Sequence, residues 1–410
     1  MSTTKASDGL QVKTLAAGTA MTFVVLLGVV SLFSDTTYEG ARSLHGQFLQ
    51  ILGSSAMAVG IAAGAGEFLG YAVRLISGHL ADRSGRYWMI TLLGYTINLL
   101  AIPAMALAGY WQIAIALLFL ERIGKGIRNP SRDAMLSYAT SQVGRGFGFG
   151  LHEAMDQIGA ILGPLVVAGV LALRIGTRTD MSAYQNAYGL LLIPALLALV
   201  VLVAARFLFP RPADLESRTP QVSTKGYRRQ YWLYLAAVGC FAAGFADLAL
   251  MAYHFNAISM APDQWIPIFY ATAMGVDALA ALVLGRLYDK LGFRVLLGVF
   301  ILAAFFAPPV FLGSLPFALA GLALWGIGMG AQESIMRAVV ADLVPRERRA
   351  TGFGLFHTGF GVAWFLGSAL MGFLYDQSVV YLVVFSVVIQ LCAIPVLLAA
   401  HQQATSEAAA

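Results

Sequence analysis

Gly78-His79-Leu80-Ala81-Asp82-Arg83-Ser84-Gly85-Arg86 is a short polar stretch between two long apolar runs. A related stretch, Gly285-Arg286-Leu287-Tyr288-Asp289-Lys290-Leu291-Gly292-Phe293-Arg294, recurs about half a chain length later. Both fit the pattern G-x-L-x-D-(R/K)-x-G-x-R, and we interpret each as a polar loop that joins two helices. The residues that define the pattern are Gly78, Asp82, Arg83, Gly85 and Arg86 in the first copy, and Gly285, Asp289, Lys290, Gly292 and Arg294 in the second.

The composition around these stretches is that of a membrane protein. Of the 410 residues only 11% are charged and 59% are hydrophobic, whereas a soluble domain carries roughly a quarter charged residues. At about 20 apolar residues per span, the chain has room for about a dozen transmembrane helices. Its two cysteines, Cys240 and Cys392, lie inside apolar runs and indicate neither a disulfide framework nor a cysteine metal site.

The hydrophobic pattern predicts an all-α polytopic membrane protein with twelve transmembrane helices. The predicted spans are roughly 16–38, 54–77, 88–109, 111–140, 146–173, 183–209, 230–258, 265–287, 295–312, 315–343, 350–374 and 379–400. The longest polar stretch, 210–229, reads as a cytoplasmic linker between two six-helix bundles, 1–209 and 230–410. Gly148-Phe149-Gly150-Leu151 recurs as Gly352-Phe353-Gly354-Leu355, and Gly124-Lys125-Gly126 as Gly328-Met329-Gly330. Repeats in the same order predict two parallel, pseudo-symmetric halves.

Lys and Arg gather in every second loop, for example at 206–211 and 346–349, whereas most alternate loops carry almost none. By the positive-inside rule both termini are then cytoplasmic. This placement explains the net charge of +5 better than a nucleic-acid partner does. We therefore expect a multi-pass protein of a bacterial cytoplasmic membrane, in contact with lipid and without nucleic acid.

Ionisable side chains inside the predicted spans cost about 2.5 to 3.5 kcal/mol each on insertion scales, so they normally face a partner or a pathway. The candidates for proton coupling or for the substrate pathway are Asp35, Glu39, Glu67, Arg74, Arg122, Lys125, Arg128, Glu153, Asp156, Asp247, Asp277, Glu333, Arg337 and His357. The set is interpreted either as a structural ion-pair network or as a proton relay or gate. An asymmetry favours function, because Lys125 and Arg128 match Met329 and Gln332 in the second half.

Helical spacing predicts some of the pairings among these charges. Glu67, Glu153 and Asp156 are expected to neutralise a basic stripe that contains Lys125 and Arg128. Glu333 and Arg337 lie four apart and are expected to pair with each other. Asp35, Glu39 and Arg42 share one face at the end of the first span, as an internally paired helix terminus or as an outer gate.

The paired G-x-L-x-D-(R/K) stretches resemble the loop between the second and third helices of major facilitator superfamily transporters. The resemblance implies that Asp82 caps the start of the eleventh span near Thr351-Gly352, and that Asp289 caps the fifth near Gly146-Phe147. It further implies that these aspartates pair with nearby arginines when the cytoplasmic side is closed. The physical basis is that a carboxylate at a helix N-terminus meets free N–H groups.

Two further stretches resemble proton-coupled antiporters of the same superfamily. Leu118-x-x-x-Arg122-x-x-Lys125-Gly126 is similar to the fourth-helix motif, in which the arginine is linked to proton movement. Gly159-x-x-x-Gly163-Pro164 is similar to the fifth-helix motif associated with antiporters. Together they imply proton coupling and favour export.

We therefore expect a secondary active transporter of a small molecule or ion, coupled to protons, working as a monomer by alternating access. The sequence has no Walker-type loop for ATP and implies no cofactor and no enzyme activity. An uptake symporter or a facilitator is the alternative, including a transition-metal transporter that uses Asp247, Met251 and His254. An intramembrane enzyme or a sensor is a remote alternative, since the histidines form no zinc or nucleophile signature.

Overall fold

The computed structural model describes residues 2–54, 56–173, 181–216, 227, 229–246, 248–260 and 266–409. Across these residues all regular secondary structure is helical, and none of them forms a strand. The predicted all-α class is therefore confirmed, and every predicted span corresponds to one helix or to two consecutive helices.

The chain groups into two compact units. Unit 1 consists of Met1–Gly144, Leu151–Arg218 and Arg348–Gly354, and unit 2 consists of Arg145–Gly150, Thr219–Glu347 and Leu355–Ala410. The division between Arg218 and Thr219 falls inside the stretch expected to be the linker. The units differ from two simple halves in one respect, because each contains a short segment from the opposite half of the sequence.

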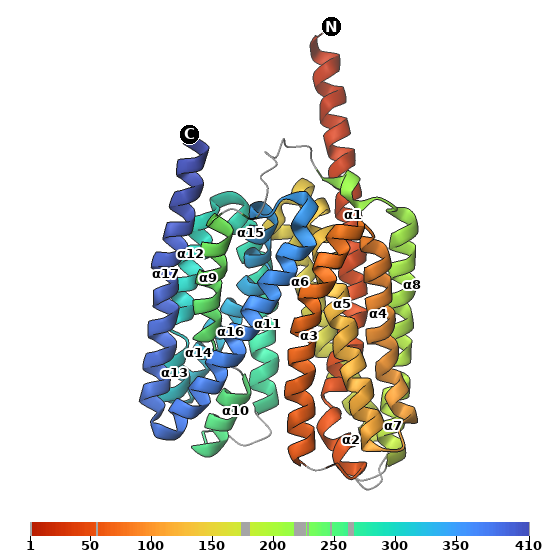
Figure 1. Cartoon of the computed structure of the whole chain (residues 1–410), viewed down its shortest axis with the longest axis vertical. Coiled ribbons are helices and arrows are strands. Elements are labelled where there is room, and N and C mark those ends of the chain that lie inside the picture. The colour runs from red at the N-terminus through yellow and green to blue at the C-terminus, as the bar shows by residue number, and fades with distance from the viewer. Residues whose placement is uncertain are drawn as a thin grey trace. The chain divides into compact units, whose positions relative to one another are not determined.

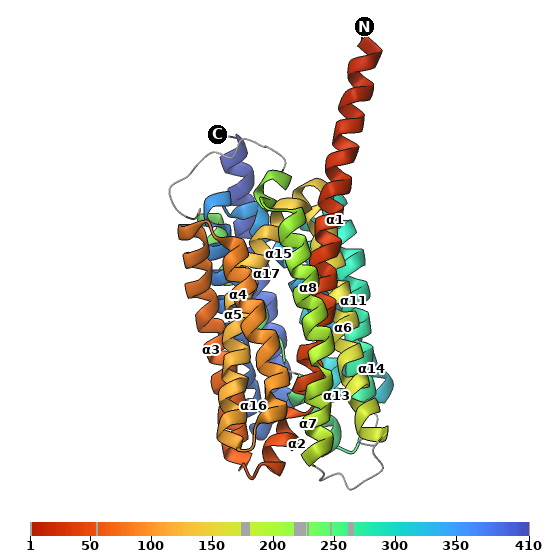
Figure 2. The same ribbon diagram turned by 90° about the vertical axis from the view of Figure 1, so that its right-hand side faces the viewer.

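Unit 1 is built mainly from the N-terminal helices, which Figures 1 and 2 show running alongside one another. Its elements are α1 (Ser2–Arg42), α2 (His45–Ile51), α3 (Ala56–Ser84), α4 (Tyr87–Ala104), η1 (Met105–Leu107), α5 (Trp111–Val143), most of α6 (Arg145–Leu173), α7 (Met181–Leu190), α8 (Leu192–Leu208) and η2 (Pro212–Leu215). Helix α5 packs against both α3 and α4, and α1 packs against α8.

Unit 2 repeats the same kind of arrangement with the C-terminal helices. Its elements are α9 (Arg229–Ala243), α10 (Leu248–Ala257), α11 (Ile266–Leu291), α12 (Phe293–Ala304), α13 (Ala307–Leu312), α14 (Leu315–Glu333), α15 (Ile335–Leu343), most of α16 (Arg349–Gln377) and α17 (Val379–Ala409), with a short 3-10 turn η4 (Arg346–Arg348) before α16. Helix α9 packs against α17, and α11 against α14 (Figure 1).

Eight helical segments of the described chain are long and apolar enough to cross a membrane. They are Ala17–Arg42, Tyr87–Leu107, Arg145–Leu171, Met181–Leu208, Phe293–Leu312, Leu315–Leu343, Arg346–Gln377 and Val379–Gln403. The other predicted spans correspond to α3, α5, the pair α9 and α10, and α11. Helix α5 is long enough to span a membrane, with 33 residues. It is not among the eight segments because it contains six charged residues between Glu121 and Asp133.

Several spans predicted as continuous are interrupted, including the one that is divided into α9 and α10. The break between α7 and α8 lies at Leu191, shortly before Pro194, and the break between α12 and α13 lies at Phe305-Phe306, before Pro308. A proline in a helix has no N–H to donate to the preceding turn, which favours a break there. A further break is at Ser334, whose backbone is non-helical and whose hydroxyl donates to the carbonyl of Gly330.

The motifs at Gly78–Arg86 and Gly285–Arg294 are mostly helical, so the loops between the helices are shorter than predicted. Helix α3 continues to Ser84 and α11 to Leu291, and only Gly85-Arg86 and Gly292 separate them from α4 and α12. Gly85 and Gly292 have φ angles of 66° and 60°. Glycine adopts this left-handed conformation without strain, and it ends a helix within one residue. The motif is thus a helix end followed by a one- or two-residue turn.

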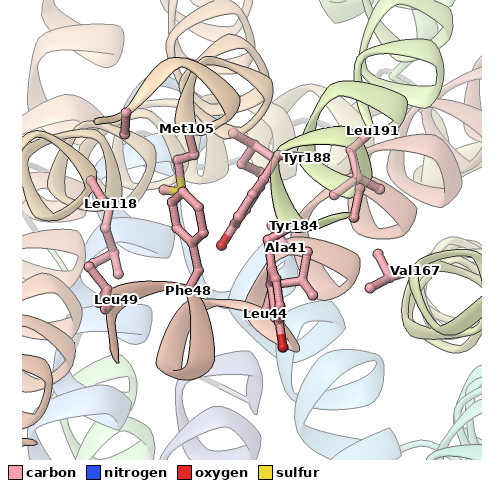
Figure 3. Packing of buried hydrophobic residues seen from close by; sticks show 14 of the residues in the cluster. Ala41, Leu44, Phe48, Leu49, Met105, Leu118, Val167, Tyr184, Tyr188 and Leu191 are labelled. Atoms are coloured by element: carbon pink, nitrogen blue, oxygen red, sulfur yellow. The ribbon is translucent and has the colours of Figure 1, made fainter. Parts of the chain in front are cut away.

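Buried hydrophobic residues close one end of unit 1, where α1, α2, η1 and α7 meet (Figure 3). Phe48 of α2 packs against Tyr188 of α7, with 4.9 Å between the ring centroids. The hydroxyl of Tyr188 lies 2.9 Å from Nδ1 of His45. This cluster fixes the short helix α2, which the hydropathy pattern did not predict, against the end of α1.

Candidate functional site

The two motif aspartates cap helix N-termini, as the sequence predicts. Asp82 accepts hydrogen bonds from the backbone N–H groups of Ala350 (3.1 Å) and Thr351 (2.6 Å) at the start of α16. Asp289 accepts them from Gly146 (2.8 Å) and Phe147 (2.8 Å) at the start of α6. The first contact lies within unit 1 and the second within unit 2. These bonds satisfy N–H groups that a helix leaves unpaired at its first turn.

The motif glycines permit this capping because they let two backbones approach closely. A β-carbon at Gly78 would overlap the carbonyl of Ala350, and one at Gly285 would overlap the carbonyl of Gly146. The expected arginine partner of Asp82 is not among its described contacts; its third donor is instead the hydroxyl of Tyr87, at 2.8 Å. The remaining basic motif residues, Arg83, Arg86, Lys290 and Arg294, are exposed.

The environments of the two aspartates differ. Burial raises the pKa of Asp82, and the hydrogen bonds from Thr351, Tyr87 and Ala350 oppose that rise. Asp82 is half-buried, whereas Asp289 is exposed and accepts from two backbone donors. The two copies of the motif therefore make the same type of cap, with the N-terminal copy more deeply enclosed.

A second group of residues, which we call the acid–base cluster, lies inside unit 1. It consists of Asp35 of α1, Lys125 and Arg128 of α5, and Asp156 of α6. The seam between α1 and α6 brings its two acids together. A β-carbon at Gly159 would overlap the carbonyl of Leu32, and one at Gly163 would overlap that of Thr36. The Gly159-x-x-x-Gly163 stretch thus lets α6 contact the backbone of α1 directly.

The carboxyl groups of Asp35 and Asp156 interact directly with each other. Two ionised carboxylates have only acceptors and repel each other, so a proton held by one of them would stabilise the pair. Ser31 also donates its hydroxyl to Asp156. Ser31 and Tyr38 lie four and three residues from Asp35, on its face of α1. That spacing is the signal by which the sequence could have identified both as members of the site.

Arg128 is 1% exposed, and two of its guanidinium nitrogens have no hydrogen-bond acceptor among the described residues. Its Nη2 lies 3.8 Å from Oδ1 of Asp35, too far for a hydrogen bond. The guanidinium lies over the ring of Tyr95 of α4, 4.2 Å from the centroid, which is a cation–π contact. No described group accepts a hydrogen bond from its Nε or Nη1. Arg128 therefore combines deep burial with donors that have no acceptor in the described part of the chain.

Lys125 is half-buried beside the same acids. Its Nζ lies 3.5 Å from the centre of the Tyr38 ring, and it interacts electrostatically with Asp35 and Glu39. Arg122 also reaches Tyr38, donating a hydrogen bond to its hydroxyl. Tyr38 therefore separates two cations that lie one helical turn apart on α5.

The neighbouring cations of α5 have acids of their own on the same helix. Nε of Arg122 lies 3.6 Å from Oε2 of Glu121, and Nη2 of Arg132 lies 2.8 Å from Oδ1 of Asp133. Glu121 is fully buried and is held by Asn98 of α4, whose amide donates to its carboxylate at 3.3 Å. These two ion pairs flank the acid–base cluster.

Several sequence-predicted residues lie outside this cluster. Glu153 is buried and accepts a hydrogen bond from Gln157 at 2.8 Å. The side chain of Glu67 is outside the described part of the structure, and the Arg74 guanidinium lies 4.6 Å from the ring centre of Tyr71. The internal ion pair predicted on the face of Asp35, Glu39 and Arg42 is confirmed for Glu39 and Arg42, but it does not include Asp35. Glu39 and Arg42 form a partly exposed pair (3.3 Å), whereas Asp35 lies buried with Arg128.

In unit 2, Glu333 and Arg337 form the predicted ion pair across the break at Ser334. Asp277 is fully buried where α11 contacts Gly330 of α14, and His357 of α16 is also buried. These residues lie on separate elements.

For the metal alternative, Asp247 lies outside the described residues. Met251 is fully buried, and Nδ1 of His254 lies 3.0 Å from the hydroxyl of Tyr375. Within the described ranges no three His, Cys, Asp or Glu residues are grouped as metal ligands would be.

Comparison with known proteins decides the family. A family model described as the Major Facilitator Superfamily matches residues 14–294 and 246–404. The chain belongs to this superfamily. It is therefore an integral, multi-pass membrane protein of a family that transports small solutes.

The matched proteins cover nearly the whole chain. An uncharacterized protein of Mycobacterium tuberculosis (strain ATCC 25618 / H37Rv) is 39% identical over 392 residues, with 94% of each chain covered. Multidrug resistance protein MdtH of Photorhabdus laumondii is 24% identical over 341 residues, with 82% of each covered. The crystal structure of a bacterial homologue of the iron transporter ferroportin has a TM-score of 0.70 at 14% identity, covering 93% of this chain and 99% of that one. The structural likeness shows the fold alone.

Proposed function

We propose that the chain is a proton-coupled secondary transporter whose proton is held by Asp35 and Asp156. The observation that supports this proposal is the approach of two acids from α1 and α6 across a backbone-to-backbone seam, with Arg128 beside Asp35 and Ser31 donating to Asp156. Lys125, Arg128, Arg132 and His152 supply the surrounding charge. When the proton leaves, the two carboxylates repel each other, and Asp35 is drawn toward the Arg128 guanidinium.

This movement links protonation to helix position. Asp35 lies on α1 and Asp156 on α6, and these helices touch backbone to backbone at Gly159 and Gly163. A change in charge between the two acids therefore acts where the backbones of α1 and α6 are in direct contact, with no side chain between them at Gly159 and Gly163. We propose that this is how proton release drives alternation between the two access states, with Asp82 and Asp289 acting as the gate contacts.

The shared proton is tested by infrared difference spectroscopy of the purified protein. A protonated carboxyl band is expected near neutral pH and disappears in both Asp35→Asn and Asp156→Asn. Glu39→Gln is the matched control, because Glu39 pairs with the exposed Arg42 and is expected to leave the band unchanged. Persistence of the band in both aspartate variants would falsify the assignment.

Transport is tested in proteoliposomes that contain a pH-sensitive dye, with a panel of drug-like and metabolic solutes. At least one solute is expected to move protons in the wild type and none in Asp156→Asn. The name of the MdtH relative and the Gly159-x-x-x-Gly163-Pro164 motif support export over uptake. Export predicts proton movement opposite to the solute, whereas movement of both in the same direction would overturn it.

We further propose that the protein works as a monomer in a bacterial cytoplasmic membrane. The basic residues in alternate loops support a topology with both termini inside. Fusions of a reporter that is active only outside the cytoplasm are expected to be inactive at either terminus. Activity of a fusion at the C-terminus would overturn the proposed topology.

A further inference from the structure

We infer that the transported solute is a singly charged organic anion, bound through its anionic group by Arg128 and Lys125. This inference rests on the proposed transport function and names the substrate class of the same site. It follows from the balance of charge, from the unused donors of Arg128 and from the rings beside them.

The charges of the described side chains around α5 do not cancel. Arg122 is matched by Glu121, and Arg132 by Asp133. Lys125 and Arg128 then face Asp35 and Asp156, and the charge of Glu39, which also acts on Lys125, is matched by Arg42.

In the proposed protonated state, in which Asp35 and Asp156 together hold one proton, the two acids contribute one negative charge against the two positive charges of Lys125 and Arg128. A buried net charge of this kind is costly, and an anion of charge minus one cancels it.

Part of the excess positive charge lies on Arg128, whose Nε and Nη1 have no hydrogen-bond acceptor among the described residues. Arg128 is 1% exposed. The hydroxyl of the adjacent Tyr95 also has no hydrogen-bond partner in the described part of the chain. A planar guanidinium held against an aromatic ring matches the geometry of a carboxylate or sulfonate. Asp35 does not act as this acceptor, because its Oδ1 lies 3.8 Å from Nη2 of Arg128, too far for a hydrogen bond.

The same place is accessible and partly aromatic, which indicates an organic anion rather than an inorganic one. Lys125 is only half-buried, so the cluster is not sealed by protein. The rings of Tyr38 and Tyr95 lie against Lys125 and Arg128 and offer flat apolar surface beside the charged groups. Such a site favours a carboxylate or sulfonate attached to an aromatic or other flat apolar body.

Thermal unfolding of the purified full-length protein tests this inference with benzoate, benzenesulfonate and phenylphosphonate, each compared with neutral benzamide. At about ten times the dissociation constant, a bound anion is expected to raise the midpoint by about 2 °C or more. The shift is expected to vanish in Arg128→Gln and to require about tenfold more ligand in Lys125→Gln. Arg42→Gln is the charge-matched control, since Arg42 is exposed and pairs with Glu39.

Two results would overturn the inference: no anion stabilises the wild type more than benzamide does, or Arg128→Gln keeps the full shift. If Arg128→Gln does not fold, the half-buried Lys125→Gln decides, and unchanged affinity there counts against the site. The infrared test of Asp35 and Asp156 is independent of these measurements. A proton band without anion binding rejects only the substrate class, and anion binding without the band rejects only the proton coupling.

Discussion

Helix α5 of unit 1 and helix α14 of unit 2 occupy matched places in the internal repeat, yet three positions that differ between them give α5 a much more charged lining. Glu121, Lys125 and Arg128 of α5 correspond to Trp325, Met329 and Gln332 of α14. In unit 2, Trp325 stacks on Phe245 with 5.5 Å between the rings and donates to the carbonyl of Ala246. The same helix position is therefore stable with an aromatic and apolar lining.

The comparison shows that the matched position in unit 2 is packed without the charges of α5. Features shared by both units belong to the common framework, gate contacts included, whereas features of one unit point to a role specific to that unit. The shared features are the glycine seam, at Gly163 in unit 1 and Gly367 in unit 2, and the aspartate caps at Asp82 and Asp289. The acid–base cluster has no counterpart among the matched residues of α14, so it is the part of the molecule we assign to transport.

The largest effect is expected at the shared seam, and it tests whether the two units are equivalent there. Gly163→Ala and Gly367→Ala each place a methyl group against backbone, of Thr36 and Ala243 respectively. Each is expected to lower the free energy of unfolding by about 3 kcal/mol or more, because backbone cannot move aside as a side chain can. Unfolding is followed by circular dichroism in a denaturing detergent titration.

Gly169→Ala in α6 and Gly372→Ala in α16 are the matched controls, since nothing lies within 4 Å of a β-carbon at either position. They are expected to leave stability unchanged or slightly raised. A large loss in only one unit would show that the seam is not a shared architectural feature.

The second prediction converts the lining of α5 into that of α14. The triple variant Lys125→Met, Arg128→Gln, Asp35→Asn is expected to unfold within about 1 kcal/mol of the wild type, because neutralising a buried ion pair on both sides is often neutral. Its transport is expected to fall at least about 100-fold, equivalent to about 2.7 kcal/mol. Proteoliposome flux and detergent unfolding measure the two effects.

Arg128→Gln alone is the control, and it is expected to be less stable than the triple variant because Asp35 then loses its cation. If the triple variant fails to fold while its parts are tolerated, the charges serve the architecture, and the contrast between the units loses its functional meaning.

The third prediction compares how much the caps at Asp82 and Asp289 each contribute to the free energy of unfolding. Asp82→Asn is expected to cost more than Asp289→Asn, about 1–2 kcal/mol against 1 kcal/mol or less, because Asp82 is half-buried and accepts from Tyr87 as well as from two N–H groups. In transport, Asp82→Asn is expected to shift the balance of access states while solute affinity in the preferred state stays nearly unchanged. Site-specific thiol labelling reports the access state. Normal transport, or lost binding without a shift, would contradict the gate assignment.

The smallest effect concerns the end of unit 1 where α2 meets α7. Burial, aided by the charge of Arg42, lowers the pKa of His45 to about 4. Because the unfolded chain titrates near 6.5, the folded state binds fewer protons between these values, and stability is expected to fall as the pH decreases from about 6.5 toward 4. The loss is expected to stay within about 1 kcal/mol for a partly exposed ring. His45→Gln is expected to flatten this part of the pH–stability curve, and an unchanged slope would contradict it.

Much of this architecture could be predicted from sequence because it depends on local spacing. The repeated spacing identified Asp82 and Asp289 as matched residues, the resemblance to the superfamily motif implied the helix starts they cap, and the i, i+4 spacing identified the pair of Glu333 and Arg337. The extent of α3 and the breaks at Leu191 and Ser334 were missed, because hydropathy does not report where a helix stops inside an apolar run.

The pairing of Asp35 with Asp156 was beyond sequence reasoning for a different reason. The two acids come from helices far apart in the chain, and the contact depends on how closely α6 approaches α1 at Gly159. Spacing along one helix cannot report a distance between two helices. It assigned Asp35 to a face with Glu39 and Arg42, whereas packing placed it against Arg128.

The short segments exchanged between the units have a consequence for biosynthesis. Unit 1 is complete only when Arg348–Gly354 has been made, about 130 residues after Arg218. At typical translation speeds of 5–20 residues per second, this is a delay on the order of ten seconds. During that interval Asp82 lacks the N–H groups of Ala350 and Thr351 from which it accepts hydrogen bonds. The N-terminal half therefore completes its assembly only after most of the C-terminal half has emerged from the ribosome.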